Sequence, residues 1–238
     1  MKRMILLIGL IAMIVCSASA YRTDNFDFSI NGDLITTPTA NEAKMDQIEM
    51  GYSPSYSQTN AVAYDAYAKF KYDSIFFFNG HGLSYSDGTK GGGIKFSDES
   101  WILGKYDNSH NPGSSRYFID GYNSNDIDDS LLAVYISCYS SYTNQYNGNI
   151  ASISKDKGVD MSIGFTGEIE TNNGKCWSEN FWERTKNGET VSNAISNAKD
   201  DCFWCIPIGY HGIDTYKAYV ENGRNLNVCL TPARQGTI

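Results

Sequence analysis

The amino-acid sequence predicts an α/β fold, a three-layer α/β/α sandwich around a mostly parallel central sheet. Three short, unbroken apolar runs at 74–78, 131–136 and 161–165 are typical of strands buried on both faces. Segments with helical periodicity lie before the first run and after the last. Strands and helices that alternate in this way pack as a parallel sheet covered by helices on both sides.

The first eighty residues predict two strands and two helices. An early strand is expected at Asp33–Thr37, and a helix at Asn41–Met50. The strand Ser74–Phe78 ends this part of the chain. The second helix precedes that strand, because four apolar side chains recur there on one face, namely Val62, Ala66, Tyr67 and Phe70.

The rest of the chain predicts a hairpin, two further strands and two further helices. The hairpin is expected around Gly91–Phe96, in a region rich in Gly, Ser, Asn and Asp. The strands are Leu131–Ile136 and Met161–Phe165, which are continuous apolar runs. Apolar side chains at helical spacing predict one helix around Trp177–Trp182 and another that begins at Thr190.

The first twenty residues predict a secretory signal peptide. Two basic residues precede an apolar run at 4–15, which is shorter than the roughly 20 residues of a membrane span. The small side chains of Ala18 and Ala20 then predict cleavage before Tyr21. Residues 21–238 are expected to form a single domain, because neither an internal repeat nor a low-complexity linker divides them.

The charge balance argues against two classes of partner. The chain has 19 Lys and Arg against 27 Asp and Glu, a formal net charge of −8. An acidic chain is unsuited to non-specific binding of nucleic acid or of anionic membranes. Beyond the signal peptide no apolar run is long enough to span a bilayer. We therefore expect a protein that is secreted or displayed on the cell surface.

Cysteine usage separates one thiol from four others. Five cysteines follow the signal peptide, and an odd number in a secreted chain indicates a reactive thiol. Cys138 stands apart and is the candidate. The last 37 residues, 202–238, are expected to add strands at the sheet edge, tied by disulfides. Four cysteines in the last third of the chain can form two disulfides in three connectivities: Cys176, Cys202, Cys205 and Cys229.

A histidine and a cysteine follow two of the predicted buried strands. His81 follows the run at 74–78 after Asn79 and Gly80, and Cys138 follows the run at 131–136 after Ser137. Functional residues of open α/β sheets gather beyond the carboxyl ends of the strands. A thiolate is a nucleophile, and an adjacent imidazole activates it and protonates the leaving group. The absence of a side chain at Gly82 lets its N–H approach a developing oxyanion.

The order of these motifs resembles the caspase–gingipain–legumain clan of cysteine peptidases, which includes clostripain and CHAT-type domains. Members carry an apolar strand that ends in His-Gly and a second that ends in a small residue and the nucleophilic Cys. The matching segments are 74–82 (SIFFFNGHG) and 131–138 (LLAVYISC). His81 and Cys138 are 57 residues apart, near the about 50 of caspases. The segments 161–167 and 177–198 resemble the strand and two helices of gingipain-like members.

The resemblance implies a secreted cysteine endopeptidase of caspase-like fold that hydrolyses proteins or peptides through a thioester and needs no cofactor. Cys138 is the implied nucleophile and His81 its acid–base partner. The N–H groups of Gly82 and Cys138 form the implied oxyanion hole. An aspartate in the specificity pocket, Asp87 or Asp120, predicts a basic residue before the cleaved bond. The segment Ile136–Ser140 departs from the Gln-Ala-Cys-x-Gly of caspases, which argues against aspartate-specific cleavage.

Other interpretations remain open on the sequence. The same fold without catalysis predicts an extracellular binding or signalling module. His211, in a second His-Gly, is an alternative partner for Cys138, whereas His110 lies in a solvated turn. The pair Cys202 and Cys205 allows a thiol oxidoreductase, and the four late cysteines a zinc site. Calcium is a further alternative for an acidic stretch whose spacing is not that of an EF-hand: Asp120, Asp126, Asp128 and Asp129.

Overall fold

A six-stranded sheet forms the centre of the molecule in a computed structural model of the chain. The model describes residues 21–28, 37–58, 61–110, 115–205, 212–230 and 232. The strands of the sheet are β1 (Arg22–Asp27), β2 (Ser53–Gln58), β3 (Ile75–Asn79), β8 (Leu132–Ile136), β9 (Met161–Phe165) and β10 (Tyr216–Val220). Their order is β10-β9-β8-β3-β1-β2, and all neighbours are parallel except β10 and β9. The predicted mostly parallel sheet is confirmed.

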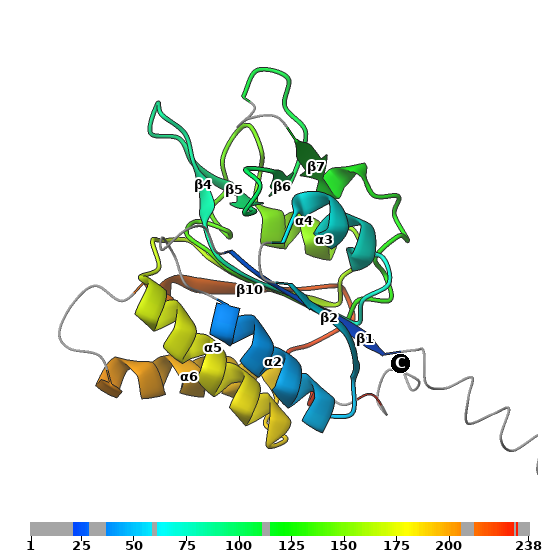
Figure 1. Cartoon of the computed structure of the whole chain (residues 1–238), viewed down its shortest axis with the longest axis vertical. Helices are drawn as coiled ribbons and strands as arrows, with labels where there is room; N and C mark the ends of the chain where they lie inside the picture. The colour runs from blue at the N-terminus through cyan, green and yellow to red at the C-terminus, as the bar shows by residue number, and fades with distance from the viewer. Residues whose placement is uncertain are drawn as a thin grey trace, which may run out of the picture.

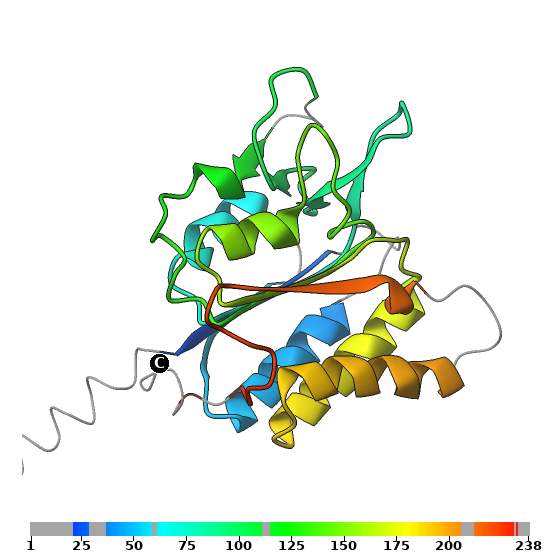
Figure 2. The same cartoon turned by 180° about the vertical axis from the view of Figure 1, so that it is seen from behind.

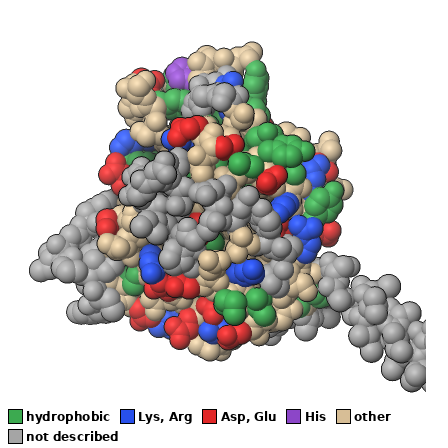
Figure 3. All heavy atoms as spheres, viewed as in Figure 1, with side chains coloured by type: hydrophobic (Ala, Val, Ile, Leu, Met, Phe, Trp, Pro, Cys, Tyr) green, Lys and Arg blue, Asp and Glu red, His purple; other side chains and the backbone are tan. Residues whose placement is uncertain are grey.

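Three helices cover one face of this sheet. They are α2 (Thr37–Glu49), α5 (Thr171–Lys186) and α6 (Val191–Cys205), and Figure 1 shows them together below the strands. Their buried side chains include Trp177, Phe181 and Trp182 of α5 and Ala194 of α6, all in one core with the sheet. Acidic and basic side chains alternate over the solvent side of this layer (Figure 3), where Lys186 contacts Asp46 at 2.6 Å.

Two shorter helices and a small second sheet cover the opposite face. The helices are α3 (Ala63–Phe70) and α4 (Ile150–Asp156). The strands are β4 (Gly82–Ser84), β5 (Lys90–Lys95), β6 (Trp101–Leu103) and β7 (Arg116–Phe118), in sequence order across the sheet. Figure 1 shows this group above the central strands. Helices on both faces of the sheet confirm the predicted three-layer α/β/α sandwich.

The unbroken apolar runs are explained by burial on both faces. Successive side chains of a strand point to opposite sides. Ile75 and Phe77 of β3 therefore join the core beneath α2, α5 and α6, whereas Phe76 and Phe78 join the core beneath α3 and α4. The strand β8 divides its side chains between the two cores in the same way.

Several predicted bounds shift by a few residues. The helix expected at Asn41–Met50 begins earlier, at Thr37, and Thr37 was assigned to a strand. Residues 33–36 of that expected strand lie outside the described part of the chain. The hairpin expected around Gly91–Phe96 is present, with residues 91–95 in its strand β5, which pairs antiparallel with β4 on one side and with β6 on the other.

The C-terminal part adds one strand at the edge of the sheet, as expected. After a short 3-10 helix, Ile213–Thr215, β10 pairs with β9. The chain then passes along the helical layer, which Figure 2 shows from behind. The carbonyls of Leu226 and Val228 accept hydrogen bonds from Ser192 and Val191, both at 2.9 Å. They satisfy N–H groups that the first turn of α6 leaves without helical partners.

Candidate active site

The pairing of β3 with β8 places His81 and Cys138 at the same edge of the sheet. Asn79 of β3 lies opposite Ile136 of β8, and each candidate residue is two positions beyond. The N–H of Gly80 donates to the carbonyl of Ile136 at 3.0 Å, so the pairing continues past the strands. Parallel strands end at one edge, so His81 and Cys138 both lie at this edge, where they line one cleft.

Gly82 lies directly against the backbone of Cys138. A Cβ at Gly82 would stand 1.8 Å from the carbonyl oxygen and 3.1 Å from the nitrogen of Cys138. The first separation is far below a normal non-bonded contact distance, and the second is at its lower limit. This position therefore requires glycine. The glycine brings two backbone segments from different strands together, and both residues line one cleft.

The N–H of Gly82 points away from the small sheet. Lys95 donates its N–H to the carbonyl of His81 at 2.9 Å, and Gly82 lies opposite Ile94. This bond makes Gly82 and Ile94 a non-hydrogen-bonded pair of the antiparallel ladder. In such a pair, each residue directs its own N–H and C=O away from the partner strand. The Gly82 N–H is therefore directed out of the pairing with β5.

The Cys138 thiol is half-buried and contacts both the N–H and the carbonyl of Ile169. The N–H of Ile169 donates to Sγ at 3.3 Å, and Sγ lies 3.6 Å from the carbonyl of Ile169, to which the S–H donates. Burial raises the pKa of the Cys138 thiol, and the nearby Glu168 carboxylate adds to this, while the Ile169 N–H and Lys90 oppose it. The thiol is therefore protonated at neutral pH in this state.

The chain makes a sharp turn at Tyr139, directly after the candidate nucleophile Cys138. Its φ is 61°, a left-handed conformation that is uncommon for a residue with a side chain. Such outliers persist where surrounding contacts impose them. Here the Tyr139 N–H donates to the carbonyl of Gly167 at 2.9 Å, and the Ser140 hydroxyl accepts the N–H of Phe165 at 3.0 Å. These bonds tie the turn to the end of β9.

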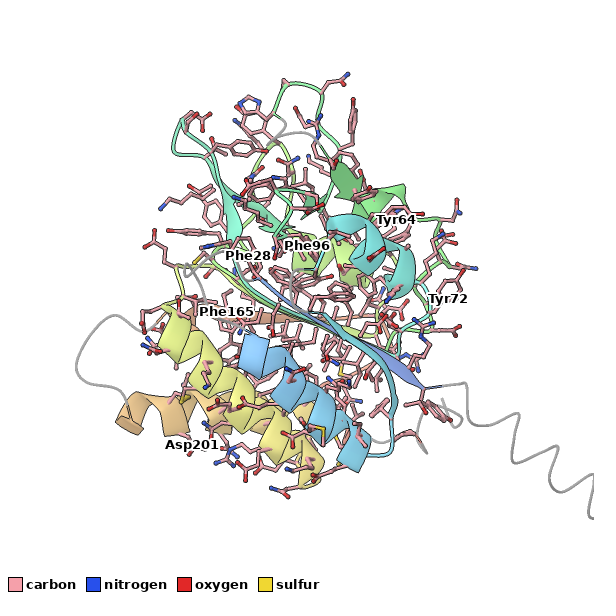
Figure 4. The ribbon with its side chains drawn as sticks, in the orientation of Figure 1. Phe28, Tyr64, Tyr72, Phe96, Phe165 and Asp201 are labelled. Atoms are coloured by element: carbon pink, nitrogen blue, oxygen red, sulfur yellow. A yellow bond between two sulfur atoms is a disulfide. The ribbon has the colours of Figure 1, made fainter. Side chains whose placement is uncertain are left out.

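His81 is positioned by an aromatic ring from the neighbouring strand. Phe28, directly after β1, meets the imidazole edge to face with 4.6 Å between ring centroids. Figure 4 shows Phe28 at the same end of the sheet as Phe165, the last residue of β9. The carboxyl ends of β1, β3, β8 and β9 thus all contribute to this edge.

An open cleft of about 460 Å³ contains both candidate residues. Its lining includes His81, Gly82 and Cys138 together with Lys90, Glu168 and Glu170. A second cavity, also of about 460 Å³, shares Lys90 and Tyr139 with it and is otherwise lined by uncharged side chains and glycine. The two cavities form neighbouring hollows on either side of these shared residues.

Three polar side chains form a connected group beside the thiol. Lys90 Nζ donates to the Tyr139 hydroxyl at 2.7 Å and to Glu168 Oε1 at 3.1 Å. The Tyr139 hydroxyl donates to the same carboxylate oxygen at 2.9 Å. The bonds to Tyr139 and Glu168 raise the pKa of Lys90, and the bonds from Lys90 and Tyr139 lower the pKa of Glu168. Lys90 and Glu168 are therefore a charged pair at neutral pH.

The disulfide arrangement is simpler than expected. Cys176 of α5 and Cys202 of α6 form a disulfide with a Cα–Cα distance of 5.9 Å. Cys229 is a free thiol that donates to the carbonyl of Gly188. Cys229 lies opposite Thr190, and Cys205 is the last residue of α6. The fifteen residues of α6 span about 22 Å. Cys229, beside the start of α6, and Cys205, at its end, are therefore farther apart than the about 7 Å between Cα atoms that a disulfide allows.

Two expectations about the late cysteines are therefore wrong. The bond between Cys176 and Cys202 joins two helices and does not tie the edge strand. It also consumes Cys202, so the Cys202–Cys205 pair is not a dithiol that an oxidoreductase can cycle. Within the described residues no three His, Cys, Asp or Glu side chains gather as a metal site.

The remaining candidates lie away from the cleft or outside the described chain. His110 stacks on Tyr146 and approaches Asp87, with 3.6 Å between Nε2 and Oδ2. Asp120 accepts a hydrogen bond from the N–H of Tyr106. Neither Asp87 nor Asp120 is among the lining residues of the cleft. The signal peptide and His211 lie outside the described residues, and no described helix is long and apolar enough to cross a membrane.

Sequence reasoning missed Lys90, Glu168 and the backbone of Ile169. Lys90 precedes the three-glycine run, which lets β5 pack closely on the loop after Cys138, as Gly91 does against Tyr139. Glu168 directly follows Thr166 and Gly167, the two residues after β9. Residues 168–170 follow β9, a third parallel strand whose carboxyl end lies at the same edge of the sheet. This position was the signal by which the sequence could have placed them at the site.

No family model matches this chain, and no curated protein matches it in sequence. Its structure is similar to the crystal structure of the Arg-specific cysteine proteinase gingipain R, with a TM-score of 0.57 and 11% identity. That match covers 89% of this chain and 48% of the other. The complex of the pro- and mature domains of RgpB from Porphyromonas gingivalis is also similar, with a TM-score of 0.52, 11% identity, and coverage of 89% and 49%.

The chain spans about half the length of these two structures. At 11% identity the likeness is one of fold. The chain thus shares the fold of gingipain R, which agrees with the caspase-like fold that the sequence resemblance implied.

Proposed function

We propose that this chain is a secreted cysteine endopeptidase that acts through a dyad of Cys138 and His81. The observation that carries the proposal is the continued pairing of β3 and β8, which brings both residues to one cleft. The close packing of Gly82 on the Cys138 backbone supports it, because it brings into contact the two residues whose N–H groups are to bind the oxyanion. Residues 1–20 act as the signal peptide, and 21–238 as the peptidase domain.

The reaction proceeds in two steps. His81 takes the proton of the Cys138 thiol, and the thiolate attacks the carbonyl carbon of the peptide bond. The N–H groups of Gly82 and Cys138 bind the oxyanion of the tetrahedral intermediate. When this collapses, the C–N bond breaks, the imidazolium gives its proton to the leaving amine, and a thioester remains. Water, activated by His81, then hydrolyses the thioester and restores the thiol.

The substrate is an extended peptide that crosses the cleft. The two cavities that meet at Lys90 and Tyr139 provide room for side chains on successive substrate residues. Glu168 and Glu170 give the cleft beside the thiol an acidic wall, opposed by the ammonium group of Lys90.

A second function is favoured by the state of the thiol. Burial raises the pKa of Cys138, and the Ile169 N–H donates a hydrogen bond to its Sγ. A resting thiol of this kind also suits a binding or signalling module that keeps the fold without catalysis. The two functions differ in whether Cys138 and His81 are needed for a chemical step.

Digestion of a peptide library, read by mass spectrometry, tests the proposal. We expect cleavage by the purified chain, its loss in Cys138→Ala, and a decrease of at least about 100-fold in His81→Ala. Cys229→Ala and His110→Ala are matched controls and should cleave normally. Cleavage that survives Cys138→Ala would overturn Cys138 as the nucleophile. A folded chain that cleaves nothing in the library would overturn the peptidase and favour the binding module.

A further inference from the structure

The segment Glu168–Glu170 lies over the thiol and is attached at two sides. Behind it, the N–H groups of Thr166 and Gly167 donate to the carbonyl and hydroxyl oxygens of Thr215 at 2.9 and 3.0 Å. These bonds fix the base of the segment to the short helix before β10. Its tip, Ile169, contacts the sulfur with both N–H and C=O.

The front of the same segment is attached by the Lys90–Tyr139–Glu168 group. Lys90 comes from β5, Tyr139 from the turn after β8, and Glu168 from the exit of β9. The three side chains thus link three separate parts of the chain across the mouth of the cleft. Lys90 also lies 4.6 Å from the centroid of the Tyr139 ring.

We propose that Lys90 and Tyr139 are positioning residues that hold Glu168, and through it Ile169, against the Cys138 thiol in a resting state. Substrate entering the cleft displaces this clasp, defined as the Lys90–Tyr139–Glu168 group, and frees the sulfur for attack. The proposal deepens the function above and rests on Cys138 as its reactive thiol. It assigns the side chains beside the nucleophile a role in access, separate from the acid–base chemistry of His81.

The clasp and simple electrostatics predict opposite effects of removing Lys90. The positive charge of Lys90 favours the thiolate of Cys138, so electrostatics alone makes the sulfur less reactive when the charge is lost. Release of Glu168 instead exposes the sulfur, so a clasp makes it more reactive. The sign of the change in thiol reactivity therefore separates the two roles.

Alkylation of Cys138 by iodoacetamide measures this sign without reference to peptide hydrolysis. The rate is followed by peptide mass spectrometry from pH 6 to the plateau at high pH, where every thiol is ionised and the rate reports access. The variants are Lys90→Met and Tyr139→Phe, with Lys90→Arg as the conservative substitution. Lys95→Met is the matched control, because Lys95 lies on the same strand and pairs with Glu99 at 2.7 Å.

We expect Lys90→Met and Tyr139→Phe to raise the plateau rate roughly two- to five-fold, the size set by an exposed ion pair. Lys90→Arg and Lys95→Met should leave it unchanged. A plateau rate that is unchanged or lower in folded Lys90→Met and Tyr139→Phe overturns the clasp. If the chain cleaves no peptide and Lys90→Met still accelerates labelling, the clasp stands and the peptidase fails, so the two failures are distinguishable.

Discussion

Gly82 and Cys138 are in direct backbone contact, so close that a methyl group at position 82 would lie 1.8 Å from the Cys138 carbonyl oxygen. The contact joins the exit of β3 to the exit of β8. It sets the separation of the two segments that carry the imidazole and the thiol. The geometry of the candidate site is therefore fixed by main-chain packing before any side chain is considered.

Gly82→Ala should consequently damage both the fold and the site. We expect a loss of about 1–3 kcal/mol in the free energy of unfolding, because the backbone must shift to admit the methyl group. Urea denaturation measures it, and peptide cleavage should fall with it. Gly121→Ala is the control, because a Cβ there meets its nearest neighbour at 3.4 Å. Equal stability of the two variants would contradict the close contact.

Cys138 should titrate as a buried thiol while the cleft is empty. Burial and the Glu168 carboxylate raise its pKa, so the midpoint of alkylation against pH should lie above that of an ordinary thiol, about 8.5. Glu168→Gln removes one of the two causes and should shift the midpoint downward. Iodoacetamide labelling with free cysteine as reference checks both. A wild-type midpoint below the reference would show an activated resting thiolate instead.

The disulfide should account for a large part of the stability of the helical layer. Cys176 and Cys202 are separated by 26 residues, and closing a loop of that length stabilises the folded state by about 3–4 kcal/mol. Cys176→Ser with Cys202→Ser should lower the free energy of unfolding by this amount in urea. Cys229→Ser, which removes a free thiol, should have little effect. A double variant as stable as the parent would show that the bond does not form.

The sequence predicted the strands and helices whose patterns arise from burial. Phe76 and Phe77 are apolar because each faces a different core, and this gives a run that is visible without any structure. His81 and Cys138 follow the ends of two such runs, so the candidate dyad could also be predicted from the sequence. Continuous apolar runs that alternate with helices also predict that strands such as β3 and β8 are parallel.

The strands β1 and β2 were missed because their sequences are polar. The strand β1 is RTDNFD, and it is buried through side chains that find polar partners, as Asn25 does in two reciprocal amide bonds of 2.9 Å with Gln47. No hydrophobic periodicity marks such a strand. The Lys90–Glu168 pair was missed for another reason, since it joins residues 78 positions apart and depends on the completed sheet.

The polar interior of β1 continues into a buried pair of carboxyl groups. Asp24 of β1 and Asp73, just before β3, are both fully buried. Arg22 contacts them at 3.2 and 3.7 Å and is itself partly exposed. Burial, followed by the charge of Asp24, raises the pKa of Asp73 to about 10. The Asp73 carboxyl is therefore neutral in the folded protein at physiological pH.

This carboxyl should make the protein less stable as the pH rises. Between the unfolded pKa of about 3.9 and the folded pKa, the folded chain retains a proton that the unfolded chain has lost. Stability should then fall by up to about 1.4 kcal/mol per pH unit. Asp73→Asn removes the effect, so its stability relative to the parent should increase from pH 5 to pH 8 in urea denaturation. Asp126→Asn is the contrasting control, because Lys71 lowers the pKa of Asp126 and stabilises the folded protein at high pH. A parent-to-variant difference for Asp73→Asn that is equal at both pH values would show that Arg22 keeps Asp73 ionised.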